Sequence, residues 1–501
     1  MALLQDYAPF LESVRSAVKP GQPAYVVGGA VRDSLLGLPI HDLDFALVGN
    51  TLQVARAVAK QLKAHYYALD DERQATRVIL TLGDGSLLYL DFIRLFGGDL
   101  DQDLRHRDFT VNAMALSLAD PSTILDPCLG QADLAQKMLR PCSPTSLVDD
   151  PVRALRGIRL AIQFGWQMAV ETVYQIKQAF PRLGESSPER QRDELFKILS
   201  GPKPDQAFRL MERLGGLPYL LPELAALKGE TQSPPHELDV WEHTLTLLRH
   251  LSWLTSCFNT PLVPDPFQDD LTNRLALHLN KFQPAVLAHL EKRLNPDRSH
   301  VALLYLAGLY HDVAKPATRT VDSQDRIHAY RHEQVGADVV ATRGRALVLS
   351  HPELDWLRTV VRQHMRVHSL AQVERELSRR AIYHFFKDSG AAGIDVCLLS
   401  LADTLATYGP ILPDEVWEGE LAVVSSLFSA WWEKPEQQVR PPALVDGNLL
   451  IKALELKPGP QIGRLLERIR EAQIIGQVQT QEEALEFARR IMEEASDESS
   501  S

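Results

Sequence analysis

A short stretch near the N-terminus places a glycine turn ahead of two acidic residues. The apolar run 25–27 is typical of a buried strand, and Gly28 and Gly29 directly after it permit a tight turn and a close approach to a phosphate. A helix that starts there directs free N–H groups toward an anion. Asp42 and Asp44 begin a second apolar run, and alternate residues of a strand share one face, where two carboxylates favour a pair of Mg²⁺ ions. This combination is the equipment of nucleotidyl transfer.

Each of these signals is common when it occurs alone. Most glycine turns only reverse the chain, and Asp-x-Asp is frequent on solvated loops. The joint spacing, together with Arg32-Asp33 and Leu36-Gly37, resembles the signature of the DNA-polymerase-β-like nucleotidyltransferase superfamily. Within it, the chain looks like the class II branch that holds CCA-adding enzymes and bacterial poly(A) polymerases. The resemblance implies an α/β head on a small mixed sheet, in which Gly28, Gly29 and Arg32 hold phosphates.

Two further segments complete the expected head site. Asp91 is a charge inside a strand pattern and is our candidate for a third metal-binding acid, the alternative being an edge-strand residue that faces water. The segment from Leu104 to Ala115 resembles the Arg-Arg-Asp-Phe-Thr-x-Asn-Ala motif of the same family, with His106 in place of its first arginine. Arg107 can bridge a triphosphate, and Asn112 can hold a ribose hydroxyl or polarise a phosphate.

A helical segment after the head carries a candidate nucleotide-selecting motif. Asp150 and Arg153 are three residues apart, so we expect them on one helical face, where an acceptor and a fork of donors can read cytosine and adenine edges. An ordinary surface salt bridge is the alternative. The segment resembles the family's selecting motif, with Asp149 where Glu is frequent, and the resemblance adds Arg156 and Arg159 to the nucleotide-binding residues. Downstream, Ser187 and Glu189 form an ordinary helix start.

The middle of the chain carries a second set of metal-ligand residue types. Imidazole and carboxylate groups suit a transition metal such as Mn²⁺, Ni²⁺, Fe²⁺ or Zn²⁺, and such an ion can acidify a water that attacks a phosphoester. A single helical histidine is more often structural. The ordered set, with Lys315-Pro316 directly after His311-Asp312 and its two following residues, resembles the HD phosphohydrolase superfamily. The resemblance implies that His332 and His364 can hold a second metal. Some members of the family keep the domain chiefly as an RNA-binding body. The set is His243, His311, Asp312, His332, His364 and Asp403.

Composition sets the outer limits of the function. The 501 residues exceed one hydrophobic core, so two to four domains are expected. No uninterrupted membrane-spanning run or signal-peptide core is visible, and the four cysteines lie far apart in the sequence with no Cys-x-x-Cys, which favours the cytoplasm and argues against a zinc ribbon. The net charge of −12 neither indicates nor excludes a nucleic-acid partner, because a local basic patch is sufficient for binding. The oligomeric state is left open.

The elements that must position these residues follow from the periodicity of the chain. Strands are expected at residues 24–27, 43–47, 78–82 and 87–93, with a hairpin turn at 83–85 between the last two. From Leu147 onward the pattern is almost wholly helical. We therefore expect five parts, a nucleotidyltransferase head (1–143), a helical neck (144–235), an HD domain (236–413), a small helical tRNA-binding module (414–490) and a disordered acidic tail (491–501). In the module, Arg464, Arg468 and Arg470, with Lys452 and Lys457, can contact RNA phosphates, or they form a solvated face.

The resemblance predicts template-independent addition of C or A nucleotides to the 3′ end of tRNA. CTP and ATP are then the substrates, and two Mg²⁺ ions at Asp42, Asp44 and Asp91 are the cofactors. Residues 94–103 form a short acidic loop where CCA-adding members carry a longer one, which leaves CC addition and CCA addition both open. The alternatives are a poly(A) polymerase, a metal-dependent phosphohydrolase of RNA ends with a degenerate head, and a non-catalytic RNA-binding scaffold. Intact Asp42 and Asp44 argue against degeneracy, and the complete acid sets argue against a scaffold.

Overall fold

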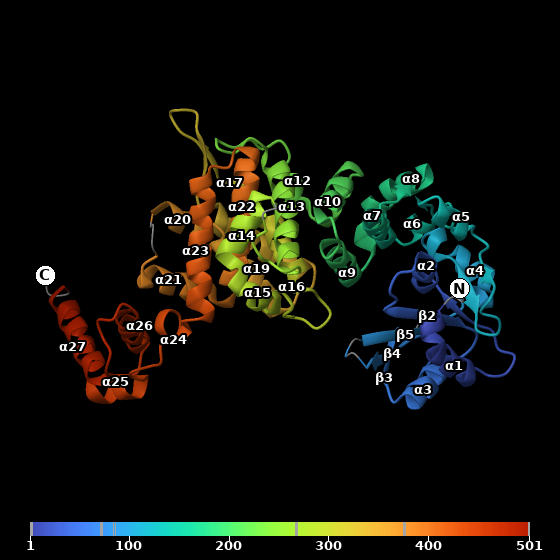
Figure 1. Ribbon diagram of the computed structural model, residues 1–501, viewed down its shortest axis with the longest axis horizontal. Helices are drawn as coiled ribbons and strands as arrows, with labels where there is room; N and C mark the ends of the chain where they lie inside the picture. Colours follow the sequence, from blue (N-terminus) through green and yellow to red (C-terminus); the bar gives the residue numbers. More distant parts are fainter. Residues whose placement is uncertain are drawn as a thin grey trace. The chain divides into compact units, whose positions relative to one another are not determined.

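The computed structural model of the chain describes residues 4–70, 74–83, 85, 87–265, 269–373 and 377–498. It separates into two compact units (Figure 1). The first consists of Met1–Gly201 and Arg209–Leu220, and the second of Pro202–Phe208 and Leu221–Ser501. The expected head and most of the expected neck therefore form one unit, and the helical parts that follow form the other.

The first unit is built on a seven-stranded mixed sheet in the order β3-β4-β5-β2-β1-β6-β7. The β2–β5 pair is parallel and the other neighbours are antiparallel. The strands are β1 (Ala24–Val27), β2 (Asp42–Leu47), β3 (His65–Asp70), β4 (Ala75–Thr81), β5 (Leu87–Arg94), β6 (Ala115–Ser117) and β7 (Ile124–Leu125). All four expected strands are present, and β4 and β5 pair as expected, although Asp84 of the expected turn lies outside the described residues. The sequence did not predict β3, β6 or β7.

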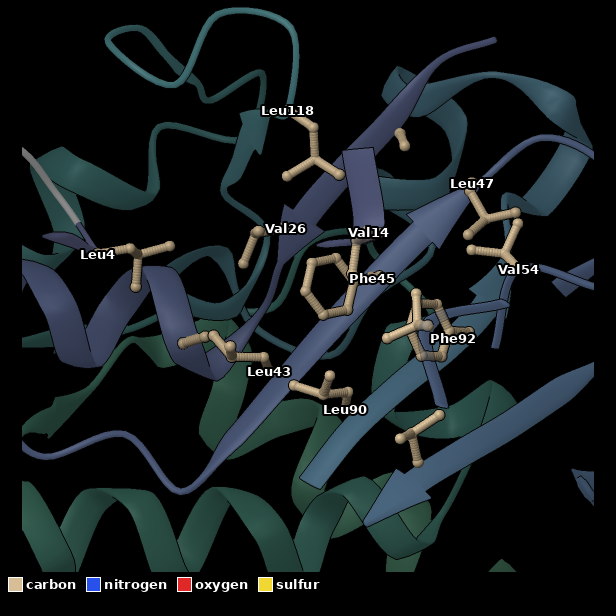
Figure 2. Close-up of a cluster of buried hydrophobic side chains, with 14 of the residues drawn as sticks. Leu4, Val14, Val26, Leu43, Phe45, Leu47, Val54, Leu90, Phe92 and Leu118 are labelled. Atoms are coloured by element: carbon tan, nitrogen blue, oxygen red, sulfur yellow. The ribbon is translucent and has the colours of Figure 1, made fainter. Parts of the chain in front are cut away.

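One face of this sheet carries the main core of the head. Strand β5 alternates buried and partly exposed residues, as a sheet with one covered face requires. Phe45 of β2 and Phe92 of β5 stack with ring centroids 5.2 Å apart, beside Val26 and Leu43 (Figure 2). The head helices are η1 (Gln5–Tyr7), α1 (Ala8–Ala17), α2 (Gly29–Leu36), α3 (Thr51–Leu62), η2 (Phe96–Gly98), α4 (Leu100–Arg105), η3 (Thr110–Asn112) and α5 (Gly130–Ala135).

The rest of the first unit is helical, as the sequence predicts. Helix α7 packs against α8 and α9, and a short parallel pair of β8 with β9 ties the head to this bundle. Ser187 caps α9 by accepting a hydrogen bond from the Arg190 amide, as expected. The elements are β8 (Met138–Leu139), α6 (Ser146–Asp149), α7 (Val152–Phe164), β9 (Gln167–Met168), α8 (Val170–Ala179), η4 (Phe180–Glu185), α9 (Pro188–Leu199), α10 (Pro204–Arg213), which crosses into the second unit, and α11 (Leu217–Leu220).

The second unit is a helical body around the almost wholly buried α22. The segment Arg379–Ile411 is apolar enough to cross a membrane, but 83% of its apolar window is buried inside the protein, which is typical of a core helix. The elements are α12 (Pro222–Ala225), α13 (Val240–Phe258), α14 (Asp270–Leu279), η5 (Asn280–Phe282), α15 (Gln283–Leu290), α16 (His300–Tyr310), α17 (Lys315–Thr318), β10 (Arg319–Val321), β11 (Ile327–Ala329), α18 (His332–Ala346), α19 (His351–Gln363), α20 (Arg366–Val373), α21 (Arg379–Ser389), η6 (Gly390–Ala392), α22 (Gly393–Tyr408), η7 (Gly409–Ile411), α23 (Asp414–Trp432) and α24 (Pro435–Gln438).

The C-terminal elements differ from expectation in two places. Helix α23, which we expected in the terminal module, packs instead against α14, α20 and α22. The module itself consists of α25 (Gly447–Ala453), α26 (Pro460–Ile474) and α27 (Gln481–Glu498) around their own apolar cluster. Disorder was expected from residue 491, but α27 continues to Glu498, and Ile491 and Met492 pack on that cluster. Apolar residues at helical spacing outweigh the acidic composition there, and residues 499–501 lie outside the described part.

Candidate functional site

The glycine turn of the head holds the backbone in a conformation that excludes a side chain. Strand β1 ends at Val27, and α2 begins at Gly29 after Gly28, whose φ of 80° and ψ of −138° are accessible to glycine alone. A Cβ on Gly28 would lie 3.2 Å from Arg107 Nη1 and 3.2 Å from Asp44 Oδ2. The turn therefore lies directly between an expected phosphate-binding arginine and an expected metal-binding acid.

The three expected acids lie together on the sheet. Asp42 and Asp44 alternate along β2, and Asp91 lies directly beside Asp44 in the parallel β2–β5 pair. Burial and then the neighbouring Asp91 raise the pKa of Asp44 to about 6, and the same two causes raise the pKa of Asp42. Asp91 accepts two hydrogen bonds from Arg77, both of 2.7 Å. Crowded carboxylates with raised pKa values fit divalent cations, which would replace the protons as counter-charge.

The expected phosphate-binding residues form a connected network beside these acids. Arg32 Nη1 donates to Asn112 Oδ1 at 2.6 Å, and Asn112 Nδ2 donates to Asp108 Oδ1 at 3.1 Å. Asn112 is only 2% exposed, so its side chain orients Arg32 from within the protein. Arg107 donates to Asp103 Oδ2 at 3.0 and 3.1 Å. Sequence reasoning identified the arginines, but it did not find Asp103, the acid that holds Arg107.

The expected nucleotide-selecting residues lie where the neck meets this network. Asp150 has non-helical backbone angles and precedes α7, so it does not share a helical face with Arg153, contrary to expectation; Pro151 follows it and disfavours a helical conformation there. The pair still meets, with Arg153 Nε 3.4 Å from Asp150 Oδ2, and Arg190 of α9 donates to the same oxygen at 2.7 Å. Asp150 is therefore held by two arginines at the start of α7.

The two remaining arginines of α7 connect this helix to the head and to α9. Arg156 Nε lies 2.8 Å from Asp108 of the head, and Arg159 Nε lies 2.8 Å from Glu194 of α9. The positive charge of Arg156 lowers the pKa of Asp44 and so opposes the effect of burial. One face of α7 thus directs positive charge toward the acids of β2, an arrangement suited to a polyphosphate.

In the second unit, all six expected metal ligands converge. His243 lies on α13, His311 and Asp312 follow α16, His332 begins α18, His364 ends α19 and Asp403 lies on α22. His243, His311 and Asp312 form one possible metal-binding group, and Asp312, His332 and His364 form another, so Asp312 belongs to both. His243 Nε2 lies 2.9 Å from Asp403 Oδ1. These two groups would hold neighbouring cations, with Asp312 belonging to both.

The hydrogen bonds made by three of these histidines also fit a metal. Nδ1 of His311, His332 and His364 lies within 2.7–2.8 Å of a backbone carbonyl, which fixes Nδ1 as the donor and leaves Nε2 for a ligand. The Nε2 atoms of His243 and His311 face carboxylates, at 2.9 Å from Asp403 Oδ1 and 3.1 Å from Asp312 Oδ2. Burial, and then His311 and His332, lower the pKa of His364 to about 3, so it is neutral, as a ligand must be. Burial opposes protonation of His311 and His332 as well, but Asp312 raises the pKa of both.

A cavity of about 440 Å³ lies beside this cluster, and its wall includes residues that the sequence did not predict. His368 on α20 places Nε2 2.9 Å from Asp403 Oδ2 and Nδ1 2.6 Å from Glu420 Oε1 on α23. Burial opposes its protonation, but the hydrogen bonds to Asp403 and Glu420 raise the pKa of His368 to about 10. Lys315 Nζ lies 2.6 Å from Asp312 Oδ2. The spacing of His364 and His368 was a usable signal, whereas nothing in the sequence identifies Glu420.

A third buried group of ligand types is closed by hydrogen bonds. Nε2 of His289 and Nε2 of His300 lie 2.8 and 2.9 Å from the two oxygens of Asp395, and the Trp356 indole donates to Asp395 at 2.6 Å. Its carboxylate oxygens are therefore already occupied, and the group ties α15, α16, α19 and α22 together. We assign this group to the core of the unit.

Comparison with known proteins connects both sites to one family. Residues 24–140 match the family described as "Poly A polymerase head domain", 165–228 "Probable RNA and SrmB- binding site of polymerase A", 271–408 "HD domain", and 440–488 "tRNA nucleotidyltransferase domain 2 putative". A CC-adding tRNA nucleotidyltransferase of Thermus thermophilus is 33% identical over 475 residues, which cover 93% of this chain and 92% of that protein. The chain belongs to the tRNA nucleotidyltransferase family. The class II resemblance and the HD domain are thereby confirmed.

The similar proteins differ in the nucleotides that their names say they add. An A-adding tRNA nucleotidyltransferase of Deinococcus radiodurans is 32% identical and covers 96% of this chain and 98% of its own length. The structures of a CCA-adding enzyme with ATP and with CTP have TM-scores of 0.59 and 0.58 at 21% and 20% identity; they cover 97% and 96% of this chain and 96% and 98% of their own chains. This likeness confirms the predicted fold, an α/β nucleotidyltransferase head followed by helical parts that include an HD domain. The HD match begins at residue 271 and so does not include His243.

Proposed function

We propose that this protein adds cytidylate to the 3′ end of tRNA in the cytoplasm, with CTP as substrate and without a template. The main support for the proposal is that Asp42, Asp44 and Asp91 lie together on the sheet beside the turn at Gly28. Relatives that cover nearly the whole chain are named as tRNA nucleotidyltransferases, which supports tRNA as the partner. Mg²⁺ held by these acids would lower the pKa of the RNA 3′-hydroxyl and screen the triphosphate.

The residues around the acids have distinct roles in this proposal. Arg32 and Arg107 bind the triphosphate, and Asn112 and Asp103 hold these two arginines in place. Asp150 and Arg153 select the base by offering an acceptor and a donor to its edge, and Arg190 fixes Asp150. Arg156 and Arg159 carry positive charge along α7 toward the nucleotide.

The loop 94–103 favours the addition of two cytidylates over complete CCA addition. Asp103 accepts a hydrogen bond from the Phe96 amide at 3.0 Å and also holds Arg107, so the short loop is tied to a phosphate-binding residue. A short, anchored loop offers little freedom to reshape the pocket for ATP after CTP. The CC-adding relative of Thermus thermophilus supports this choice, and the A-adding relative of Deinococcus radiodurans is the competing precedent.

The test extends defined tRNA substrates and resolves the products at single-nucleotide length. With CTP and ATP together, a tRNA that lacks its last three nucleotides should grow by two residues and stop, and the Asp44→Ala variant should add none. Growth by three residues would overturn CC addition in favour of CCA addition. Growth of a CC-ended tRNA by one adenylate would indicate an A-adding enzyme, and long adenylate tails would indicate a poly(A) polymerase.

The second unit supports a second function, the hydrolysis of a phosphoester at an RNA end. The supporting observation is the pair of ligand groups that share Asp312 at the wall of a cavity. A transition metal there would acidify a bound water. The purified protein, loaded with Mn²⁺, Ni²⁺, Fe²⁺ or Zn²⁺, should release phosphate from RNA ends that carry a 2′-phosphate, or open a 2′,3′-cyclic phosphate. Asp312→Ala should abolish hydrolysis and leave nucleotide addition intact, and a wild-type protein without hydrolysis under every metal would contradict this function.

A further inference from the structure

A second cavity adjoins the cavity beside the metal-ligand cluster. Its volume is also about 440 Å³, and its wall is formed by the segment 230–236, by Lys315 of α17 and by residues of the β10–β11 hairpin. The two cavities share four residues, which are Pro235, His236, Lys315 and His332. A ligand that carries two charged groups can therefore place one group in each cavity.

The charges of the two cavities are opposite. Among the described residues of its wall, the cavity beside the cluster has Lys315 against four acids, which are Asp312, Asp403, Glu415 and Glu420. The described wall of the second cavity has one acid, Glu230, against three cations, which are Lys315, Arg319 and Arg326. Carboxylates attract metal cations, whereas lysine and arginine attract phosphate. The cavity beside the cluster therefore suits metal ions, and the second cavity suits an anion.

Lys315 lies between the metal ligands and the second cavity. Its Nζ lies 2.6 Å from Asp312 Oδ2 and donates to Gln232 Oε1 at 2.6 Å. Asp312 belongs to both possible metal-binding groups, and Gln232 belongs to the wall of the second cavity. A positive charge at this border attracts both a phosphoester at the metal ligands and an anion in the second cavity.

The two arginines of the second cavity are held at its wall by acids and by a hydroxyl group. Arg319 Nη1 is ion-paired with Glu230 and lies 3.3 Å from Thr231 Oγ1. Arg326 donates from Nε to Asp322 Oδ2 at 2.9 Å. Among the described residues, these bonds use one nitrogen of each guanidinium group, so the other N–H groups remain as donors. A guanidinium group of this kind can bind two oxygens of one phosphate.

We propose that the second cavity binds the last phosphodiester of an RNA chain whose terminal phosphoester lies at the metal-ligand cluster. This proposal rests on the hydrolytic function proposed above for the second unit, and it names RNA ends of at least two nucleotides as the preferred substrates of that site. Lys315 attracts the terminal phosphoester, and Arg319 and Arg326 bind the phosphodiester through charged hydrogen bonds. A free mononucleotide with one phosphate group leaves the second cavity without a ligand and therefore binds more weakly.

The first experiment compares two substrates of the metal-loaded, full-length protein, cytidine 2′,3′-cyclic phosphate and the dinucleotide CpC with the same cyclic end. The KM of CpC should be about tenfold lower at a similar kcat, because charged hydrogen bonds to the phosphodiester add binding energy. Arg319→Gln/Arg326→Gln should remove this difference by raising the KM of CpC alone, and unchanged kinetics with the mononucleotide would show that the fold is intact. Arg345→Gln/Arg358→Gln removes the same charge from exposed positions on α18 and α19 and is the matched control.

The second experiment measures binding without turnover. The probe is the same dinucleotide with 4-thiouridine as its first nucleoside, illuminated on the full-length protein in a chelator. Cross-links should map by mass spectrometry to the segments 230–236 and 319–329, which contribute to the wall of the second cavity. They should disappear in Arg319→Gln/Arg326→Gln and persist in Arg345→Gln/Arg358→Gln. The Arg326 side chain is 61% exposed, so Arg326→Gln alone should leave the fold intact and already reduce the cross-links.

The outcomes separate this proposal from the hydrolytic function. Hydrolysis of both substrates with equal KM values would leave the hydrolytic function intact and overturn the preference for RNA ends. An equal rise in the KM of CpC in both double variants would assign the effect to net charge and would also overturn the proposal. Cross-links that avoid both segments would exclude binding in the second cavity. Cross-links at these segments without hydrolysis of either substrate would contradict the hydrolytic function and still support a phosphodiester-binding cavity.

Discussion

The acids on β2 and β5 show how a functional residue is held at a cost to the fold. The pKa of Asp44 lies at about 6 because of burial and of Asp91, so the folded protein binds a proton there more tightly than the unfolded chain does. A group of this kind loses its stabilising contribution as the pH rises through its folded pKa. The charge of Asp91 is instead compensated by two hydrogen bonds from Arg77.

This contrast predicts opposite effects for two similar substitutions. Without metal ions, Asp44→Asn should stabilise the first unit at pH 8 by on the order of 2 kcal/mol, because it removes a buried negative charge. At pH 4 the substitution should have little effect, because Asp44 is already protonated and neutral there. Asp91→Asn should destabilise the unit by about 1 kcal/mol, because Arg77 loses a charged acceptor. Urea unfolding in a chelator at both pH values measures the two effects, and both variants should lose nucleotide transfer. Stabilisation by Asp91→Asn, or destabilisation at pH 8 by Asp44→Asn, would contradict the assigned charges.

His368 makes a residue-scale prediction in the second unit. Its Nε2 is hydrogen-bonded to Asp403 Oδ2, and its Nδ1 is hydrogen-bonded to Glu420 Oε1. His368 therefore positions the carboxylate of Asp403, an expected metal ligand. His368→Ala should weaken transition-metal binding about 10–100-fold, measured by equilibrium dialysis in an Asp44→Asn background that removes binding by the head. His278→Ala is the matched control, since His278 lies 2.8 Å from Glu418 in another histidine–carboxylate pair outside the cluster. Equal loss in both variants would indicate a general effect on the fold, and no loss in either would exclude the positioning role.

At the scale of elements, α2 depends on a glycine at each end. Gly28 precedes it with a φ of 80°, and Gly37 ends it in the left-handed region with a φ of 67°. A Cβ on Gly37 would meet nothing within 4 Å, whereas one on Gly28 would press on Arg107 and Asp44. Backbone strain is common to both positions, but contact with the site belongs to Gly28 alone.

Alanine substitutions at these two glycines should therefore separate stability from activity. Gly37→Ala should cost about 1 kcal/mol of stability through its left-handed backbone and leave transfer near the wild-type rate. Gly28→Ala should cost somewhat more and also reduce kcat on the order of 100-fold, because Arg107 and Asp44 are displaced. Urea unfolding and single-turnover CTP addition measure both quantities. If Gly37→Ala lost as much transfer as Gly28→Ala, strain in α2 rather than the contact at Gly28 would explain the defect.

Sequence reasoning succeeded where local pattern and residue type decide the outcome. The β-branched and aromatic runs of β1 and β5 and the alternation in β2 placed three acids on one sheet. It missed β3, which is largely exposed, and β6 and β7, which are too short for a periodic signal. Long-range partners such as Glu420 depend on packing that no local pattern encodes.

At the scale of the whole molecule, the protein must bind a polyanion while it carries a net charge of −12. Attraction to RNA must therefore come from local basic surfaces. In the terminal module, Leu465 and Ile469 of α26 are buried, whereas Arg464 and Arg468 are exposed one helical turn apart. This pair forms a basic edge on a helix whose apolar side is already covered by the module's own core.

The double substitution Arg464→Ala/Arg468→Ala tests whether this edge binds tRNA. Two lost phosphate contacts should weaken tRNA binding several-fold and reduce the slope of log Kd against log salt by nearly two. The KM for CTP should stay unchanged, because no nucleotide-binding residue is altered. Arg489→Ala/Arg490→Ala removes the same charge from α27 and is the matched control, with Arg490 lying over the Phe487 ring. Equal loss of affinity and slope in both double variants would mean that the net charge of the module, rather than the position of Arg464 and Arg468, determines tRNA binding.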